Sequence, residues 1–178
     1  MLKYFHLTKL QWKGILKWSL YGLLTLLVLL LQTVVLAKKT GLAVKPALLP
    51  ALIVCVCVRE GPEKGGIYAI LAALLWCLSG ADFGNLSVAV IPVGAILSAV
   101  LCRAVLTLRF LPTLLCCLAV TLLNAAVIFI FKLILPPTVA LENFWRLLLP
   151  GTAASMAFVP IHYGLVKLIS RIGVRDAL

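Results

Sequence analysis

The sequence predicts an all-α integral membrane protein with about six short transmembrane helices. Hydrophobic residues make up 64% of the 178-residue chain, and charged residues make up only 12%. A soluble domain is nearer half apolar and a quarter charged, so a soluble fold of this length could not cover its surface with polar groups. A bilayer removes that need because lipid solvates the outer faces of the helices.

The charges are unbalanced, since 16 Lys and Arg oppose five Asp and Glu and leave a net charge of +11. The cations punctuate apolar runs and do not form a soluble basic face. This pattern indicates membrane topology and argues against nucleic acid as a partner. Membrane lipids are the expected surroundings of the charged segments.

The N-terminal segment 1–17 alternates Lys with apolar and aromatic residues. It is either a basic amphipathic segment in the headgroup layer or a plain cytoplasmic flank of the first span. The first span is predicted at 18–37, where about 20 residues match the thickness of the hydrocarbon core. An apolar core of that length exceeds the usual signal-peptide range, so we expect an uncleaved anchor.

Five further apolar runs follow, with breaker-rich turns expected at 59–66 and 80–85. The runs at 46–58 and 67–79 are short, and the run at 86–102 carries Pro92 and Gly94, so tilted or broken helices are expected there. The run at 110–135 has Pro112 in its first turn and ends before two prolines. The last run covers 147–166. The predicted transmembrane domain is 18–167, and 168–178 forms a short basic tail.

The positive-inside rule selects six spans with both termini in the cytoplasm of a bacterial inner membrane. Three Lys in the first external loop oppose this arrangement, and five spans with one short run merged or buried are the alternative. Eleven of the sixteen cations lie on the cytoplasmic side of the six-span arrangement, namely Lys3, Lys9, Lys13, Lys17, Arg59, Lys64, Arg103, Arg109, Lys167, Arg171 and Arg175.

Gln32, Asn124 and His162 are polar residues within the predicted spans. Polar groups at membrane depth usually face protein or water and are functional candidates by default. The simpler interpretation for Gln32 and Asn124 is a helix–helix hydrogen bond, worth about 0.6 kcal/mol each. His162 has no cluster of His, Asp or Glu around it in the sequence that would complete a metal site.

No catalytic motif occurs: the chain has no G-x-S-x-G elbow, no Walker loop and no H-E-x-x-H. The five acids are all expected in turns or the tail, so no carboxylate is expected at membrane depth. We therefore predict no enzymatic activity, no catalytic residue, no cofactor and no metal. A soft-metal site at Cys55 and Cys57 is the minor alternative. Six cysteines without C-x-x-C spacing are predicted to pack as small hydrophobes, namely Cys55, Cys57, Cys77, Cys102, Cys116 and Cys117.

Several short motifs, in their order and spacing, resemble the rod shape-determining protein MreD family. They read PALL at 46–49, REG at 59–61, LLWCLSG at 74–80, FGN at 83–85, WRLLLP at 145–150 and IHYGLV at 161–166. The resemblance covers roughly residues 20–172 and depends on order and length more than on any one motif. Ala47 and Cys77 stand where the family commonly has Asp, which marks a divergent member.

The resemblance implies a non-enzymatic membrane scaffold of the cell-elongation machinery, which acts in lateral peptidoglycan synthesis through partner binding. The implied partners are an MreC-like bitopic protein, the MreB filament, the RodA glycosyltransferase and a class B penicillin-binding protein. Some members of the family are similar in fold to the substrate-binding subunits of energy-coupling-factor vitamin transporters. Such a subunit is the alternative function, although fold alone does not determine function.

Small residues gather in two places, where they would let another helix approach closely within lipid. Each patch is expected either to pack the chain's own helices or to receive a partner helix, such as the anchor of an MreC-like protein. The candidate packing residues are Ser79, Gly80, Gly84, Ser87, Gly151, Ala154 and Ala157.

Overall fold

The computed structural model describes residues 9–35, 47–79, 86–104, 109–134 and 151–173, and nearly all of them are helical. The prediction of an all-α fold is confirmed for this part of the chain. Residues 151–157 form a helical stretch directly before the last helix. The other elements are α1 Lys9–Leu30, the π-helical turn η1 Leu31–Val35, α3 Leu48–Glu60, α4 Pro62–Leu78, α5 Ser87–Ala104, α6 Phe110–Ile134, α8 Val159–Ser170 and the 3-10 turn η2 Arg171–Gly173.

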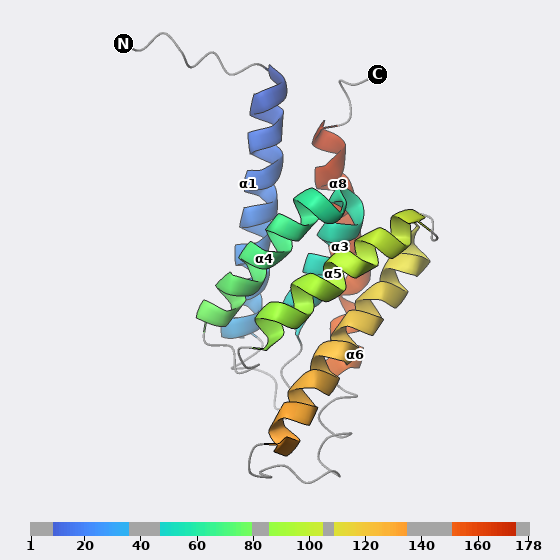
Figure 1. The fold of residues 1–178 in the computed structure, drawn as a ribbon. Helices are drawn as coiled ribbons and strands as arrows, with labels where there is room; N and C mark the ends of the chain where they lie inside the picture. Colours follow the sequence, from blue (N-terminus) through green and yellow to red (C-terminus); the bar gives the residue numbers. More distant parts are fainter. Residues whose placement is uncertain (1–8, 36–46, 80–85, 105–108, 135–150, 174–178) are drawn as a thin grey trace.

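The helices form a bundle whose segments run alternately between two ends (Figure 1). α1 begins and α8 finishes at the same end, where α3 also meets α4. Large apolar side chains stay exposed on the outside, as at Leu78, which is 83% exposed, and this suits a surface solvated by lipid. Four segments of the described chain are long and apolar enough to cross a membrane, namely Gln11–Val34, Ser87–Ala104, Phe110–Ile130 and Gly151–Ser170.

α3 is the centre of the bundle, and every residue from Leu48 to Val58 is buried. It packs against α1, α4, α5, α6 and α8. A helix that is apolar on all sides is stable only when it is surrounded. Thirteen residues span only about 20 Å, too short for a hydrocarbon core of about 30 Å. The shortness is tolerated because protein, and not lipid, surrounds α3.

The N-terminus of α3 is capped by a side chain from another helix. Gln32 Oε1, in η1, accepts hydrogen bonds from the backbone N–H groups of Leu48 at 3.2 Å and Leu49 at 3.3 Å. Pro50 is the third residue of α3 and has no N–H to satisfy. A proline in the first turn therefore costs little, because the first four N–H groups of a helix have no partner within the helix.

The turn predicted at 59–66 is wrong, because a single residue joins α3 to α4. Gly61 has a φ of 100°, in the left-handed region that favours glycine, and Pro62 starts α4 at a position where proline is well tolerated. A Cβ on Gly65 would lie 2.6 Å from Cys57 Cα, so the two helices pack backbone to backbone here. Glycines that looked like turn breakers in the sequence are close-packing residues in the structure.

Three further features of the helices differ from the sequence prediction. α1 begins at Lys9, so residues 9–17 continue the first span as one helix and are not a separate segment. α5 runs unbroken through the buried Pro92, although the sequence suggested a break. The last span is interrupted at Phe158, two residues before Pro160, and then continues to Ser170, beyond the predicted end at 166. The predicted turn 80–85 and residues 135–150 lie outside the described residues.

Candidate functional site

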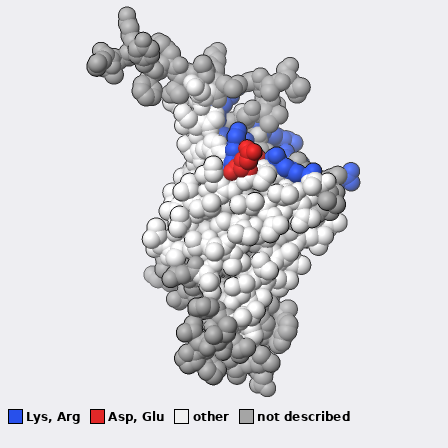
Figure 2. Space-filling view, viewed as in Figure 1, with Lys and Arg blue, Asp and Glu red and all other residues white. Residues whose placement is uncertain are grey.

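The charged side chains that the structure describes gather at the end of the bundle where α1 begins. Figure 2 shows them as a band of blue and red across an otherwise white described surface. Cations outnumber acids there, and we call this region the cationic end. Its residues are Lys13, Lys17, Arg59, Lys64, Arg103, Arg109, Lys167 and Arg171, with the acids Glu60 and Glu63.

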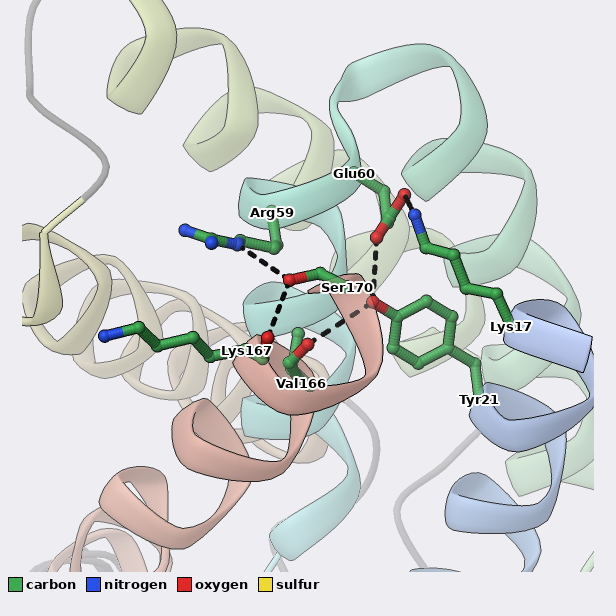
Figure 3. A network of polar contacts seen from close by, with 7 residues as sticks. All are labelled: Lys17, Tyr21, Arg59, Glu60, Val166, Lys167 and Ser170. Atoms are coloured by element: carbon green, nitrogen blue, oxygen red, sulfur yellow. Dashed lines mark hydrogen bonds and ion pairs between the residues drawn. The ribbon is translucent and has the colours of Figure 1, made fainter. Parts of the chain in front are cut away.

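Glu60, the last residue of α3, is held by two side chains from α1 (Figure 3). Lys17 Nζ lies 2.5 Å from Glu60 Oε2, and the Tyr21 hydroxyl donates to Glu60 Oε1 at 2.7 Å. The Glu60 side chain is only 8% exposed, so the pair is largely shielded from solvent. A shielded pair with a second hydrogen bond is a structural clamp, because loss of either charge leaves the other uncompensated.

A second contact ties α3 to the end of α8. Arg59 Nε donates to Ser170 Oγ at 3.1 Å, and the Ser170 hydroxyl donates to the carbonyl of Lys167 at 2.9 Å. The same Tyr21 hydroxyl that binds Glu60 also lies 3.5 Å from the carbonyl of Val166 (Figure 3). The network therefore joins α1, α3 and α8 at the cationic end.

α1 carries a row of polar contacts along the face that it turns to the bundle. In addition to Lys17 and Tyr21, Thr25 Oγ1 lies 2.5 Å from the hydroxyl of Tyr68 in α4, and Gln32 caps α3. We call Lys17, Tyr21, Thr25 and Gln32 the polar seam. Their spacing follows the helical period, so they lie on one face of α1 and of η1, the π-helical turn that continues it and carries Gln32. Sequence analysis singled out only Gln32, although polar residues at this period in an apolar span indicate a buried face.

The polar residues predicted at membrane depth lie on three different elements, Gln32 on η1, Asn124 on α6 and His162 on α8. Gln32 makes the helix–helix contact expected of it, in the form of a cap. Asn124 and His162 are buried on α6 and α8, and within the described residues Asn124 Oδ1 and His162 Nδ1 have no hydrogen-bond partner.

The first predicted small-residue patch is only partly described, since Gly80 and Gly84 lie outside the described residues. Ser79 is half-buried, and its hydroxyl donates to the carbonyl of Trp76 at 2.7 Å. Ser87 is buried at the start of α5, so it packs the protein's own helices and is not open to a partner.

The second small-residue patch is more open. Gly151 and Ala154 are half-buried and Ala157 is exposed, so this end of the last span presents a small residue to its surroundings. Gly164, two turns further along, is also exposed, and a Cβ there would meet no atom within 4 Å. The exposed small residues of this stretch leave room for another helix.

Four cysteines meet in two pairs that sequence analysis missed. Sγ atoms lie 3.8 Å apart between Cys55 and Cys117 and 3.6 Å apart between Cys102 and Cys116. Adjacent residues on a helix point about 100° apart, so Cys116 and Cys117 each contact a different neighbouring helix. Cys57 is also buried, while Cys77 is exposed. In the described part of the chain no group of three or more potential ligands could hold a metal ion.

A crevice and a groove are lined in part by residues of the cationic end. A crevice between α3, α6 and α8, which Arg59 and Lys167 help to line, has a volume of about 10 Å³ and holds no more than one water. An apolar groove of about 560 Å³ lies between α1 and α4. The crevice is too small for a substrate, and the groove is a surface feature.

No family model, no curated protein and no solved structure matches the chain. The fold and the site therefore define its class by themselves. It is a membrane-embedded helical bundle with a tightly packed apolar centre, a polar seam along its first helix and a cationic end.

Proposed function

We propose that the protein is a non-enzymatic membrane scaffold of the cell-elongation machinery, as the resemblance to the MreD family implies. The observation that supports this best is the filled interior. α3 occupies the middle of the bundle with buried apolar residues from Leu48 to Val58, where a carrier or an intramembrane enzyme would need a polar chamber. A protein whose centre is filled with packed apolar side chains has its surface available for binding partners.

The proposed setting is a bacterial inner membrane that the chain crosses six times, with both termini in the cytoplasm. The support is the cationic end, because cations accumulate on the cytoplasmic side of membrane proteins. α1 begins and α8 finishes at this end (Figure 1). α3 and α4 count as crossings in this arrangement although each is shorter than the four long segments, because α3 is solvated by protein.

The alternative function, a vitamin-binding subunit of an energy-coupling-factor transporter, has one observation in its favour. Asn124 and His162 are buried polar side chains with unused hydrogen-bonding atoms, as a ligand site would require. However, neither residue lines the groove or the crevice described above. The scaffold therefore accounts for more of the structure.

Ala157 is the position at which we propose that a partner helix packs. Replacing the exposed Ala157 by Phe should reduce co-purification of an MreC-like bitopic protein at least several-fold, because close helix packing in lipid depends on small residues. The measurement is a pull-down of the tagged protein from its native membrane, with the quantity of inserted protein as the reference.

Leu123→Phe is the matched control, because Leu123 is also exposed, at 51%, but lies on α6. This variant should retain the partner at the wild-type level. Equal retention by Ala157→Phe would exclude this docking surface. Co-purification of a transporter ATPase in place of an MreC-like protein would exclude the scaffold function itself.

A further inference from the structure

The groove between α1 and α4 has a suitable length and lining for a lipid molecule from one leaflet of the bilayer. Trp18, Gly22 and Thr25 line it from α1, and Lys64, Tyr68 and Leu75 are among the residues that line it from α4. From Lys64 to Leu75 the groove follows α4 for about 16 Å, close to half of a hydrocarbon core of about 30 Å. An acyl chain of one leaflet would fit this length.

The interior of the groove offers nothing to a polar ligand. The hydroxyls of Thr25 and Tyr68 lie 2.5 Å apart and bond to each other. The floor at Gly22 is open, since a Cβ there would meet no atom within 4 Å. An apolar chain can therefore enter the groove at the lowest cost in free energy, because it leaves no buried polar group without a hydrogen bond.

The mouth of the groove is cationic. Lys64 lines it and has no carboxylate partner among the described residues, because Glu60 is engaged by Lys17 and Tyr21. Glu63, which precedes Lys64 on α4, is exposed and does not line the groove, although it lies one turn before Ile67, which does. The cation and the apolar groove together match an anionic headgroup with its acyl chain.

We propose that this groove binds an anionic phospholipid of the leaflet at the cationic end, with the phosphate at Lys64 and one acyl chain along Gly22 and Tyr68. Charge complementarity and the length of the groove favour a lipid over a partner's helix, which would need a contact along the whole bilayer. The proposal is independent of the scaffold function, because it depends only on the groove and its cation.

The test is a lipid titration of the purified protein in mild detergent, with bound lipids counted by native mass spectrometry. Phosphatidylglycerol should bind at least several-fold tighter than phosphatidylcholine. Lys64→Gln should weaken phosphatidylglycerol binding about fivefold, which is the usual effect of one Lys beside an anionic surface, and should leave phosphatidylcholine unchanged. Gly22→Leu fills the groove from its floor and should weaken both lipids.

Two matched variants serve as controls. Arg171→Gln removes an exposed cation of the same end that does not line the groove, and Gly164→Leu adds a side chain at an equally open glycine on α8. Both should bind lipid as the wild type does. Equal affinity for the two lipids, or an equal loss in Lys64→Gln and Arg171→Gln, would overturn the proposal. If Gly22→Leu does not fold, the exposed Lys64→Gln variant still decides the outcome.

A partner's helix in the groove is the competing outcome. If a partner's helix occupied the groove, the wild type would bind the two lipids with equal affinity, and Gly22→Leu would no longer co-purify the partner. That combination would refute the lipid site and would leave the scaffold function standing. If Ala157→Phe retains the partner fully while the wild type still prefers phosphatidylglycerol, the docking surface would be refuted and the lipid site would stand.

Discussion

Glu60 shows how much a single side chain can organise in an apolar bundle. It is one of the two acids that the structure describes, and it receives both Lys17 and Tyr21 from α1. The sequence predicted that Glu60 lies in a turn, because Arg, Glu, Gly and Pro in succession usually mark one. The structure buries it at the end of α3, where it compensates a charge on another helix.

Replacing Glu60 by Gln should lower the free energy of unfolding by about 1–3 kcal/mol, because Lys17 then loses its counter-charge while still largely shielded. Tyr21→Phe, which removes only the hydroxyl, should cost about 1 kcal/mol. Unfolding in mixed detergent micelles with increasing SDS would measure both changes.

Glu63→Gln is the control for this experiment, since Glu63 is exposed on α4. Its effect should stay within about 0.5 kcal/mol. Equal losses in the Glu60 and Glu63 variants would show that the Lys17–Glu60 pair does not hold α1 in place. The Lys17→Met, Glu60→Gln double variant should lose less than the sum of the two single variants, because both remove the same interaction.

At the scale of elements, the pairing of α3 with α4 depends on glycine. Gly61 allows the one-residue corner, and Gly65 allows the backbones to approach. α5 and α6 also meet at a glycine, but there a Cβ on Gly94 would lie 3.1 Å from the side-chain methyl groups of Val120 and not from backbone. In lipid no hydrophobic drive joins helices, so close packing of this kind takes over that role.

Gly65→Ala should therefore destabilise the protein by about 1–3 kcal/mol, because the new Cβ would clash with the backbone of Cys57, which cannot move aside as a side chain could. Gly164→Ala adds the same methyl group to another helix, at a position with no atom within 4 Å. It should be neutral or stabilising by up to about 1 kcal/mol, since alanine favours helix.

Thermal unfolding in detergent compares the two variants under the same conditions. A melting temperature that rises for Gly164→Ala and falls for Gly65→Ala is the expected result. A rise in both would mean that α3 and α4 are not packed as closely as the contact at Cys57 requires.

At the scale of the whole molecule, the protein is polarised. The described charges lie at one end, and the polar seam ties α1 to the bundle from that end to the start of α3. This asymmetry of charge predicts how the protein is oriented in the bilayer, because positively charged segments of membrane proteins are retained on the cytoplasmic side.

Reporter fusions test the orientation. A fusion after Leu178 should be active only for a cytoplasmic reporter, and a fusion after Ser79, at the opposite end of α4, only for a periplasmic one. Cytoplasmic activity at both positions would contradict the arrangement, because α5, α6 and the segment Gly151–Ser170 lie between them and three crossings place their ends on opposite sides. Periplasmic activity after Leu178 would refute six spans with both termini inside. It would fit five spans with the N-terminus inside, in which one of α3 and α4 does not cross.

Composition and the length of the apolar runs were enough to predict the class of fold, because they report directly on the solvent that a chain requires. The sequence also located α5 and α6 to within a few residues, whereas it placed the start of the first span nine residues late. It singled out Gln32 as a contact between helices. These features are local, so periodicity and residue type are enough to reveal them.

The surroundings of each helix, in contrast, became known only from the packing of the folded chain. The short run at 46–58 became the centre of the bundle because five helices solvate it, a property that no window of sequence contains. Ser87 is buried and Ala157 exposed although both are small residues in apolar runs. The ion pair of Lys17 with Glu60 joins residues 43 positions apart. Such contacts arise from packing between distant segments, which is why the polar seam, the paired cysteines and the groove appear only in three dimensions.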